Sequence, residues 1–491
     1  MNATITTYTP IGISAHRLFI EVDTTRGIPS FAVIGLPDSQ VQELRERVRA
    51  AITNNGYAMP RGRVVVNITP ADVRKHAPGL DLPVALAVLM TSDDGDAPVS
   101  RHSKLGQFAA VGELALGGEL RPVRGVLAMA EAAAAGGVRY LIVAEANANE
   151  AALVAGLTVY PARTLRDAAC ILNDTWETAG AWEPTPAEFN ATDALIDVNP
   201  SGRPDMSEVV GLADVKRALM IAAAGRHSVL LVGPIGTGKT MLARRIPSLL
   251  PKMSAQEAIE VTRIHSLAGL LPPDTGLVTH RPFRAPHHTI SAMGLLGGGR
   301  DPHPGEVSLA HNGVLMLDEI LAFAPRAVED VINAVKIGES EVVRGYTRTM
   351  FPAAPLLVGA AATCRCGQSE GTEGSRCRCT PTTMEAYRDR LGDVAARFDM
   401  VINLRRRDLK QTHDTATGEV QLSSEEYRSD VTDARRTPPT STLTATDLGL
   451  HHYGHGDLTL LRVARTIADL AFSDELTDEH ITEARRYTNP T

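Results

Sequence analysis

Short apolar runs separated by turn residues characterise the first third of the chain. Four runs rich in β-branched and alternating apolar positions predict strands: residues 18–25, 30–37, 62–70 and 139–146. Residues 39–54 and 125–136 have helical composition. Glycine and proline punctuate the intervals between these elements. The pattern therefore predicts an α/β domain over residues 1–173.

The composition then changes three times along the chain. Residues 174–204 are rich in proline and hold both tryptophans, which predicts a linker. Residues 205–405 open with a helical pattern that leads into a buried strand, which predicts a second α/β domain. Residues 406–445 are rich in Thr, Ser and Asp and predict a variable surface segment. Residues 446–491 contain two helical patterns and predict a small helical domain.

A phosphate-binding motif follows the apolar run 229–232, where the chain reads GPIGTGKT. Its glycines let backbone N–H groups turn inward around phosphate oxygens, its lysine reaches the β- and γ-phosphates, and its threonine hydroxyl ligates Mg²⁺. We expect the nucleotide to contact the whole segment: Gly233, Pro234, Ile235, Gly236, Thr237, Gly238, Lys239, Thr240 and Met241.

A second apolar run, residues 314–317, ends in two acids. Asp318 is expected to hold the same Mg²⁺ as Thr240, directly or through water. Glu319 is placed to orient or deprotonate the attacking water, as phosphoryl transfer requires. The alternatives are a chance glycine-rich turn for the first motif and a buried strand that merely ends in acids for the second. Both motifs, however, follow a strand, as the phosphate-loop mechanism needs. The two motifs predict an ATP hydrolase that uses ATP and Mg²⁺, with Lys239 and Glu319 as catalytic residues.

Composition and charge narrow the class of protein. The length of 491 residues predicts several domains, and 44% hydrophobic with 22% charged residues is ordinary for a globular protein. No apolar stretch approaches the roughly 18 residues of a membrane helix, and the N-terminus has no readable secretory signal. We therefore expect a cytoplasmic protein with no membrane partner. The net charge of −8 leaves local contact with a nucleic acid possible.

Four of the five cysteines form two closely spaced pairs. Cys364 and Cys366 are one pair, and Cys377 and Cys379 are the other. In a reducing compartment such pairs favour a tetrahedral Zn²⁺ over disulfides. Free thiols and redox chemistry are the alternatives. Cys170 stands alone and is expected to be a buried small apolar residue.

Longer runs of sequence resemble a known family. These runs are IGLPDSQVQELRERVRAAI from Ile34, RPFRAPHHTISAMGLLGGG from Arg281, PGEVSLAHNGVLMLDE from Pro304 and LRVARTIADL from Leu461. They are similar to the YifB/ComM family of Mg-chelatase-like AAA+ ATPases, and the likeness covers nearly the whole chain. The resemblance implies a homo-hexameric motor on single-stranded or branched DNA, with helicase or branch-migration activity in recombination or natural transformation.

The same resemblance implies a fold. The N-terminal domain would be similar to the Lon-type protease fold, the core would carry a helix-2 insert and a pre-sensor hairpin, and the C-terminal helices would form a lid. Gly79 and Leu127 stand where a Lon-type protease has its serine and lysine. Neither residue can act as nucleophile or base, so we do not expect peptidase activity. The basic residues of this domain fit a DNA-contacting face or a solvated helix face with pairs such as Glu43 and Arg47.

Two further sets of residues gain a role from the resemblance. Arg397 matches the arginine that reaches a neighbouring subunit's γ-phosphate, with a local ion pair to Asp393 or Asp399 as the alternative. Residues 339–351 alternate around a turn and predict a β-hairpin. A hairpin at this point lines the central pore of related rings, where it would contact DNA, or it packs only on the neighbouring subunit. Its candidate DNA-binding residues are Arg344, Tyr346 and Arg348.

Two positions depart from the family pattern. Ala362 stands where the family has the sensor-1 asparagine, with Thr363 as the nearest polar residue. His455 stands where the family has the sensor-2 arginine, and Arg462 follows on the same helix. We therefore expect His455 or Arg462 to contact the nucleotide, with slow hydrolysis as a consequence. The alternative functions are a Mg-chelatase-type ATPase that remodels a protein partner and a slow-turnover regulatory ring.

Overall fold

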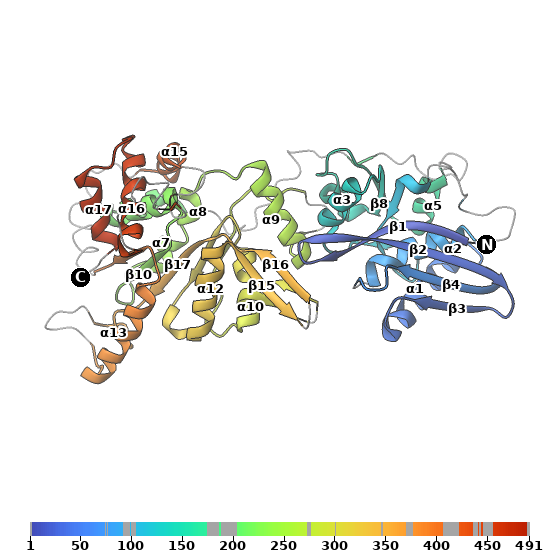
Figure 1. Cartoon of the computed structure of the whole chain (residues 1–491), viewed down its shortest axis with the longest axis horizontal. Helices are drawn as coiled ribbons and strands as arrows, with labels where there is room; N and C mark the ends of the chain where they lie inside the picture. Colours follow the sequence, from blue (N-terminus) through green and yellow to red (C-terminus); the bar gives the residue numbers. More distant parts are fainter. Residues whose placement is uncertain are drawn as a thin grey trace. The chain divides into compact units, whose positions relative to one another are not determined.

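The computed structural model separates the chain into two compact units, and many of their elements are labelled in Figure 1. The first unit comprises Met1–Ile196 and Ala258–Thr279, and the second comprises Asp197–Glu257 and His280–Thr491. The structure describes residues 2–73, 75, 77–91, 99, 105–173, 186–187, 204–272, 276–299, 301–344, 347–369, 377–405, 422–435, 440, 443–444 and 455–488.

A seven-stranded mixed sheet forms the centre of the first unit, in the order β3-β4-β2-β1-β5-β8-β9. Its strands are β1 (Asn2–Ile11), β2 (Ser14–Arg26), β3 (Ser30–Ile34), β4 (Gly62–Thr69), β5 (Phe108–Ala110), β8 (Tyr140–Ala144) and β9 (Thr158–Ala162). Its helices are α1 (Asp38–Asn54), α2 (Asp81–Leu89), α3 (Val126–Ala135), α4 (Ala148–Ala151) and α5 (Leu165–Asn173), and β6 (Glu113–Leu114) pairs with β7 (Leu120–Arg121). The predicted strands and both predicted helices of this domain are confirmed. β1 is not predicted from the sequence, because its buried threonines are polar residues in the pattern.

One arginine of the basic set has a structural role in this unit. Arg47 on α1 forms two hydrogen bonds with the buried carboxylate of Asp81, Nε to Oδ2 at 2.6 Å and Nη2 to Oδ1 at 3.1 Å. Burial raises the pKa of Asp81 to about 6, and the Arg47 hydrogen bonds oppose that rise. Arg47 also lies 3.6 Å from Glu43, the pair expected on a solvated helix face. Arg47 therefore stabilises the fold of this domain.

A segment from the middle of the chain joins the first unit, which the sequence analysis did not foresee. Helix α9 (Ala255–Ala268) begins in the second unit, and residues 258–279 belong to the first. Ser266 on this helix hydrogen-bonds the buried carboxyl of Glu150, and its oxygen accepts the Gly125 N–H at 3.0 Å. Glu150 also accepts the Leu127 N–H at 2.8 Å. These bonds satisfy polar groups that burial would otherwise leave costly.

A five-stranded parallel sheet forms the centre of the second unit, in the order β11-β14-β17-β10-β18. The strands are β10 (Val229–Val232), β11 (Phe283–Arg284), β14 (Val314–Leu317), β17 (Leu356–Ala361) and β18 (Met400–Asn403). β10, β14 and β17 are buried along their whole length, as strands covered on both faces are. Because all five strands are parallel, the residues that follow them meet at one edge.

Helices and short strands complete the second unit. They are α6 (Ala213–Gly225), α7 (Lys239–Ala243), α8 (Ile246–Leu249), α10 (Ala292–Leu296), α11 (Glu306–Leu309), α12 (Pro325–Ile337) and α13 (Pro381–Ala395), with β12 (Gly297–Gly298) paired to β13 (His303–Pro304) and β15 (Glu339–Arg344) paired to β16 (Thr347–Pro352). No described helix is long and apolar enough to cross a membrane.

Three further helices, α15 (Ser424–Ala434), α16 (His455–Leu470) and α17 (Asp478–Thr488), belong to the second unit. The two predicted C-terminal helices are confirmed. α15 lies within residues 406–445, where the sequence analysis expected only a surface segment. Its start is marked by a capping box, in which Ser423 and Glu426 exchange hydrogen bonds with each other's backbone N–H, and Val431 is buried. The sequence carries this capping signal in the spacing of Ser423 and Glu426.

Candidate nucleotide-binding site

The phosphate loop, residues 233–240, connects the central strand β10 to helix α7. Gly236 and Gly238 have φ of 85° and 81°, a region that side chains other than glycine rarely adopt. The Thr237 hydroxyl donates to the Pro234 carbonyl at 2.9 Å within the loop. The glycines at these two positions are therefore required by the backbone, as the motif predicted.

Lys239 begins helix α7, and its amine points back into the loop. Its Nζ donates to the carbonyls of Gly233 at 2.7 Å and Pro234 at 2.8 Å. Burial lowers the pKa of Lys239, and the carboxylates of Asp318 and Glu319 oppose that change. The amine is thus held where the motif places the phosphates, close to the acids that follow β14.

The two motifs meet at the carboxyl edge of the sheet. The Thr240 hydroxyl donates to Asp318 Oδ2 at 2.8 Å, across 78 residues of sequence. Asp318 Oδ1 accepts the backbone N–H of Glu319 at 3.0 Å, and Glu319 itself has φ of 51°. A hydroxyl and a carboxylate are the hard oxygen ligands that Mg²⁺ prefers, so this pair fits the ion. The negatively charged phosphates of a bound ATP would reach the Mg²⁺ at the same edge of the sheet.

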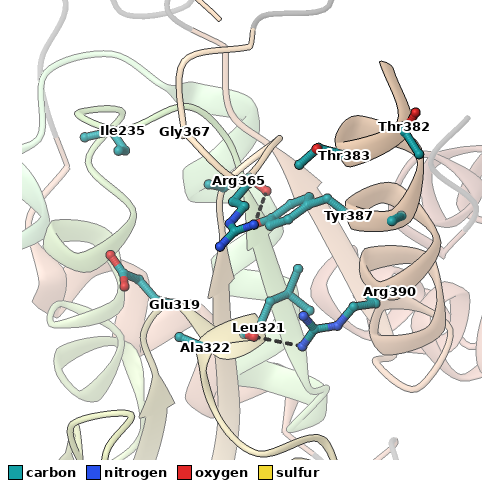
Figure 2. Close-up of a pocket in the computed structure, with 12 residues that line it drawn as sticks. Ile235, Glu319, Leu321, Ala322, Arg365, Gly367, Thr382, Thr383, Tyr387 and Arg390 are labelled. Atoms are coloured by element: carbon teal, nitrogen blue, oxygen red, sulfur yellow. Dashed lines mark hydrogen bonds between the residues drawn. The ribbon is translucent and has the colours of Figure 1, made fainter. Parts of the chain in front are cut away.

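A pocket of about 790 Å³ lies beside these residues, and Figure 2 shows its lining. Glu319 lines it together with Arg365, Tyr387 and Arg390. The Tyr387 hydroxyl donates to the Ala362 carbonyl at 3.1 Å, and Arg390 Nη2 donates to the Leu321 carbonyl at 2.9 Å. These three lining residues are not predicted from the sequence, because none belongs to a motif that marks a nucleotide site.

The sensor-1 position carries no polar side chain in the pocket. Ala362 lines the pocket, and its side chain has no hydrogen-bonding atom. The Thr363 hydroxyl, the expected polar substitute, donates to the Ser369 carbonyl at 2.5 Å. Thr363 is therefore committed to the turn that holds the cysteines rather than to the nucleotide site.

The four paired cysteines converge. Their sulfur atoms all lie within 4.8 Å of one another, with Cys364 3.4 Å from Cys366 and 3.6 Å from Cys377. Backbone N–H groups of Arg378 and Gln368 lower the pKa of Cys366 to about 6. Cys379 is the fourth member of the cluster, and none of the four cysteines forms a disulfide. Four sulfur donors in one cluster fit a tetrahedral metal ion such as Zn²⁺. Cys170 is buried, as expected.

Arg397 lies on the surface near the same pocket. Its Nη1 is 2.9 Å from Glu329 Oε1, and both side chains are partly exposed. The expected local partners of Arg397 were Asp393 and Asp399. Asp399 accepts hydrogen bonds from the backbone N–H and the hydroxyl of Ser228, both at 2.8 Å. Arg397 lines a smaller pocket of about 170 Å³ with Arg390. Its reach to a neighbouring subunit stays a prediction.

The structure does not bring Arg462 to the phosphate loop. Arg462 Nε donates to the Leu443 carbonyl at 2.6 Å, and the Asp399 carboxylate interacts electrostatically with it. Asp399 binds Ser228, which precedes β10, whereas the phosphate loop follows β10. In the described structure Arg462 therefore lies toward the opposite edge of the sheet, and its nucleotide contact stays a prediction. His455 begins α16, and its side chain lies outside the described part of the structure.

The predicted hairpin is confirmed as β15 and β16, which pair antiparallel with Arg344 opposite Thr347. Arg348 is 77% exposed and lies 3.3 Å from Glu341 on the partner strand. An exposed ion pair of this kind contributes little to stability and leaves the guanidinium accessible. Tyr346 and the Arg344 side chain lie outside the described residues.

The fold and the site define a phosphate-loop ATPase of the AAA+ class. The family described as magnesium chelatase, subunit ChlI, matches residues 205–412, and a second family of the same subunit matches residues 20–147. The competence protein ComM of Haemophilus influenzae is 37% identical, over 97% of this chain and 95% of its own. The uncharacterized protein YifB of Escherichia coli is 35% identical with the same coverage. The magnesium-chelatase 38 kDa subunit of Rhodobacter capsulatus is 27% identical over 31% of this chain and 48% of its own.

The chain belongs to the YifB/ComM family of Mg-chelatase-like AAA+ ATPases. Membership of this family implies ATP and Mg²⁺ as cofactors, and the Thr240 and Asp318 pair fits that expectation.

Two substitutions at this site are expected to have different effects. Lys239→Ala removes the amine that binds phosphates and should weaken ATP affinity by about 100-fold or more. Glu319→Gln keeps the shape of the site but removes the group that activates water. It should leave ATP affinity nearly unchanged and lower turnover by about 10²- to 10⁴-fold. Nucleotide titration and phosphate release measure the two effects separately. Equal ATP affinity for Lys239→Ala and wild type would contradict the phosphate-loop assignment.

Proposed function

We propose that the protein is an ATP-driven motor that acts on DNA as a hexameric ring. The observation that carries the proposal is the meeting of Thr240, Asp318 and Glu319 at one edge of a parallel sheet. Such an edge binds Mg²⁺ and a triphosphate and positions water for its hydrolysis. Arg397 completes the catalytic set from a neighbouring subunit in this proposal. The N-terminal domain, which we propose is Lon-like and non-proteolytic, contributes contacts within the ring.

Two features support DNA as the substrate. The hairpin β15–β16 presents Arg348 to solvent on a strand pair, a geometry that suits contact with a phosphate backbone. A relative that matches almost the whole chain is named a competence protein. The overall charge of −8 makes a local contact, such as a hairpin in a pore, more suitable than a basic outer surface. The proposed activity is helicase or branch migration in the cytoplasm.

A protein-remodelling ATPase is the second candidate. Both matching families are described by a magnesium chelatase subunit, which favours a ring that acts on a protein partner. A slow regulatory ring is the third, because Ala362 leaves the sensor-1 position without a polar side chain. The ATPase rate with and without forked DNA separates the candidates: DNA accelerates only the DNA motor, and a regulatory ring turns over slowly under both conditions.

The hairpin generates a test of the DNA proposal. Single-stranded or branched DNA should stimulate ATP hydrolysis. The double variant Arg344→Ala with Arg348→Ala should abolish this stimulation and keep the rate of ATP hydrolysis measured without DNA. Loss of two phosphate contacts should also reduce the salt-dependence slope of DNA binding by about 1.4 to 1.8. Glu341→Gln is the matched control, because it frees Arg348 and should not reduce the slope. An unchanged slope with intact stimulation would place the DNA path elsewhere.

We also propose that the four converging cysteines hold one structural Zn²⁺. Their sulfur atoms lie close enough to share a single ion, and a site closed by four cysteines suits a structural role. Cys364 is buried, and Gly367 of the same turn accepts a hydrogen bond from Ile235 of the phosphate loop. The metal would therefore fix a segment of the ATPase site without joining the reaction.

Metal analysis tests the zinc proposal. Purified protein should carry about one zinc per chain, and Cys366→Ser with Cys377→Ser should release it and lower the thermal unfolding midpoint, because such a metal contributes directly to folding. Cys170→Ala is the control and should retain the zinc. Protein purified without chelators and found to hold no zinc would contradict the proposal.

A further inference from the structure

The pocket beside Glu319 contains an arginine that no motif accounts for. Arg365 lies between Cys364 and Cys366, and it lines the same pocket as Glu319 and Ala362 (Figure 2). Its side chain is exposed, and no carboxylate among the described residues forms an ion pair with it. The guanidinium is therefore available to a ligand of opposite charge.

Two other polar side chains that line this pocket have protein partners. Arg390 donates to the Leu321 carbonyl at 2.9 Å, and the Tyr387 hydroxyl donates to the Ala362 carbonyl at 3.1 Å. Thr363 is not among the lining residues and donates to the Ser369 carbonyl. Of the two arginines that line this pocket, Arg365 is the one whose guanidinium has no hydrogen bond or ion pair with another described residue.

The backbone that carries Arg365 is fixed to the phosphate loop. The Gly367 carbonyl accepts the Ile235 N–H at 2.9 Å, and the Gly367 N–H donates to the Cys364 carbonyl at 2.9 Å. Gly367 has φ of 71°, and a Cβ there would lie 2.4 Å from the Ile235 side chain. Another residue would be strained at this φ, and its Cβ would displace the Ile235 side chain. The turn that presents Arg365 is consequently held in register with the loop that binds phosphates.

We propose that Arg365 binds the γ-phosphate of ATP and supplies the polar contact that Ala362 cannot make. The inference rests on the proposed ATPase site. A guanidinium presents a rigid fork of donors that matches phosphate oxygens, and its charge offsets the negative charge of the terminal phosphate. ADP lacks that phosphate, so Arg365 discriminates ATP from ADP.

A second arginine in this chain provides a matched control. Arg378 lies between Cys377 and Cys379, as Arg365 lies between Cys364 and Cys366, and both side chains are exposed. Arg378 is not among the described residues that line the pocket with Glu319. If Arg365 served only to balance the charge of the cysteine thiolates, substitutions of the two arginines would have the same effect.

Nucleotide affinity separates the two roles without requiring turnover. Arg365→Ala, Arg365→Lys and Arg378→Ala are titrated with Mg²⁺ and either a non-hydrolysable ATP analogue or ADP. Arg365→Ala should weaken binding of the ATP analogue by about 10- to 100-fold and change ADP affinity by less than about 2-fold. Arg365→Lys should give an intermediate loss, and Arg378→Ala should behave as wild type. Zinc content and the thermal unfolding midpoint establish that each variant keeps its fold.

Equal losses for the ATP analogue and ADP, equal effects of Arg365→Ala and Arg378→Ala, or unchanged affinity in Arg365→Ala would each overturn the inference. Failure of the ATPase site itself has a different signature. In that case Lys239→Ala would bind both nucleotides as tightly as wild type does.

Discussion

The hydrogen bond between Thr240 and Asp318 depends on the parallel order of the sheet, and the rest of the site depends on that order too. β10 and β14 both lie beside β17 and run in the same direction, so their carboxyl ends reach the same edge. The phosphate loop after β10 therefore meets the acids after β14, although no local sequence signal links the two segments. The Thr240 hydroxyl lies 2.8 Å from Asp318 Oδ2. A reversed β14 would carry Asp318 and Glu319 to the far edge.

The turn that holds the first cysteine pair adds a second constraint to this edge. It follows β17, the strand between β10 and β14, so parallel order also brings it to the phosphate loop. Backbone hydrogen bonds through Gly367 then fix the turn against Ile235. A metal held by the cysteines would stabilise the segment that carries Arg365, which connects a structural site to the nucleotide pocket.

The sequence predicted those parts of the structure that local patterns encode. The phosphate loop, the acids after β14 and the paired cysteines are short motifs. The sheet order brings the first two together, and the sulfur atoms of the four cysteines lie close together. β1 is not predicted, because its buried face carries threonines. α15 is not predicted, because the polar composition of its segment indicates a loop despite the capping box. Three features depend on tertiary contacts that no short pattern records. These are the residues 258–279 that join the first unit, the position of Arg462 away from the phosphate loop, and the exposure of Arg365 to the pocket.

A double-mutant cycle on Mg²⁺-dependent nucleotide affinity tests the central claim that one ion joins the two motifs. Affinity for a non-hydrolysable ATP analogue is measured with saturating Mg²⁺ and with EDTA for wild type, Thr240→Ala, Asp318→Asn and the double variant. Each single variant should lose most of the gain in affinity that Mg²⁺ provides. The double variant should lose little more, because residues that share one ion are strongly coupled. Independent, additive losses would contradict the shared site and with it the arrangement from which the proposed function follows.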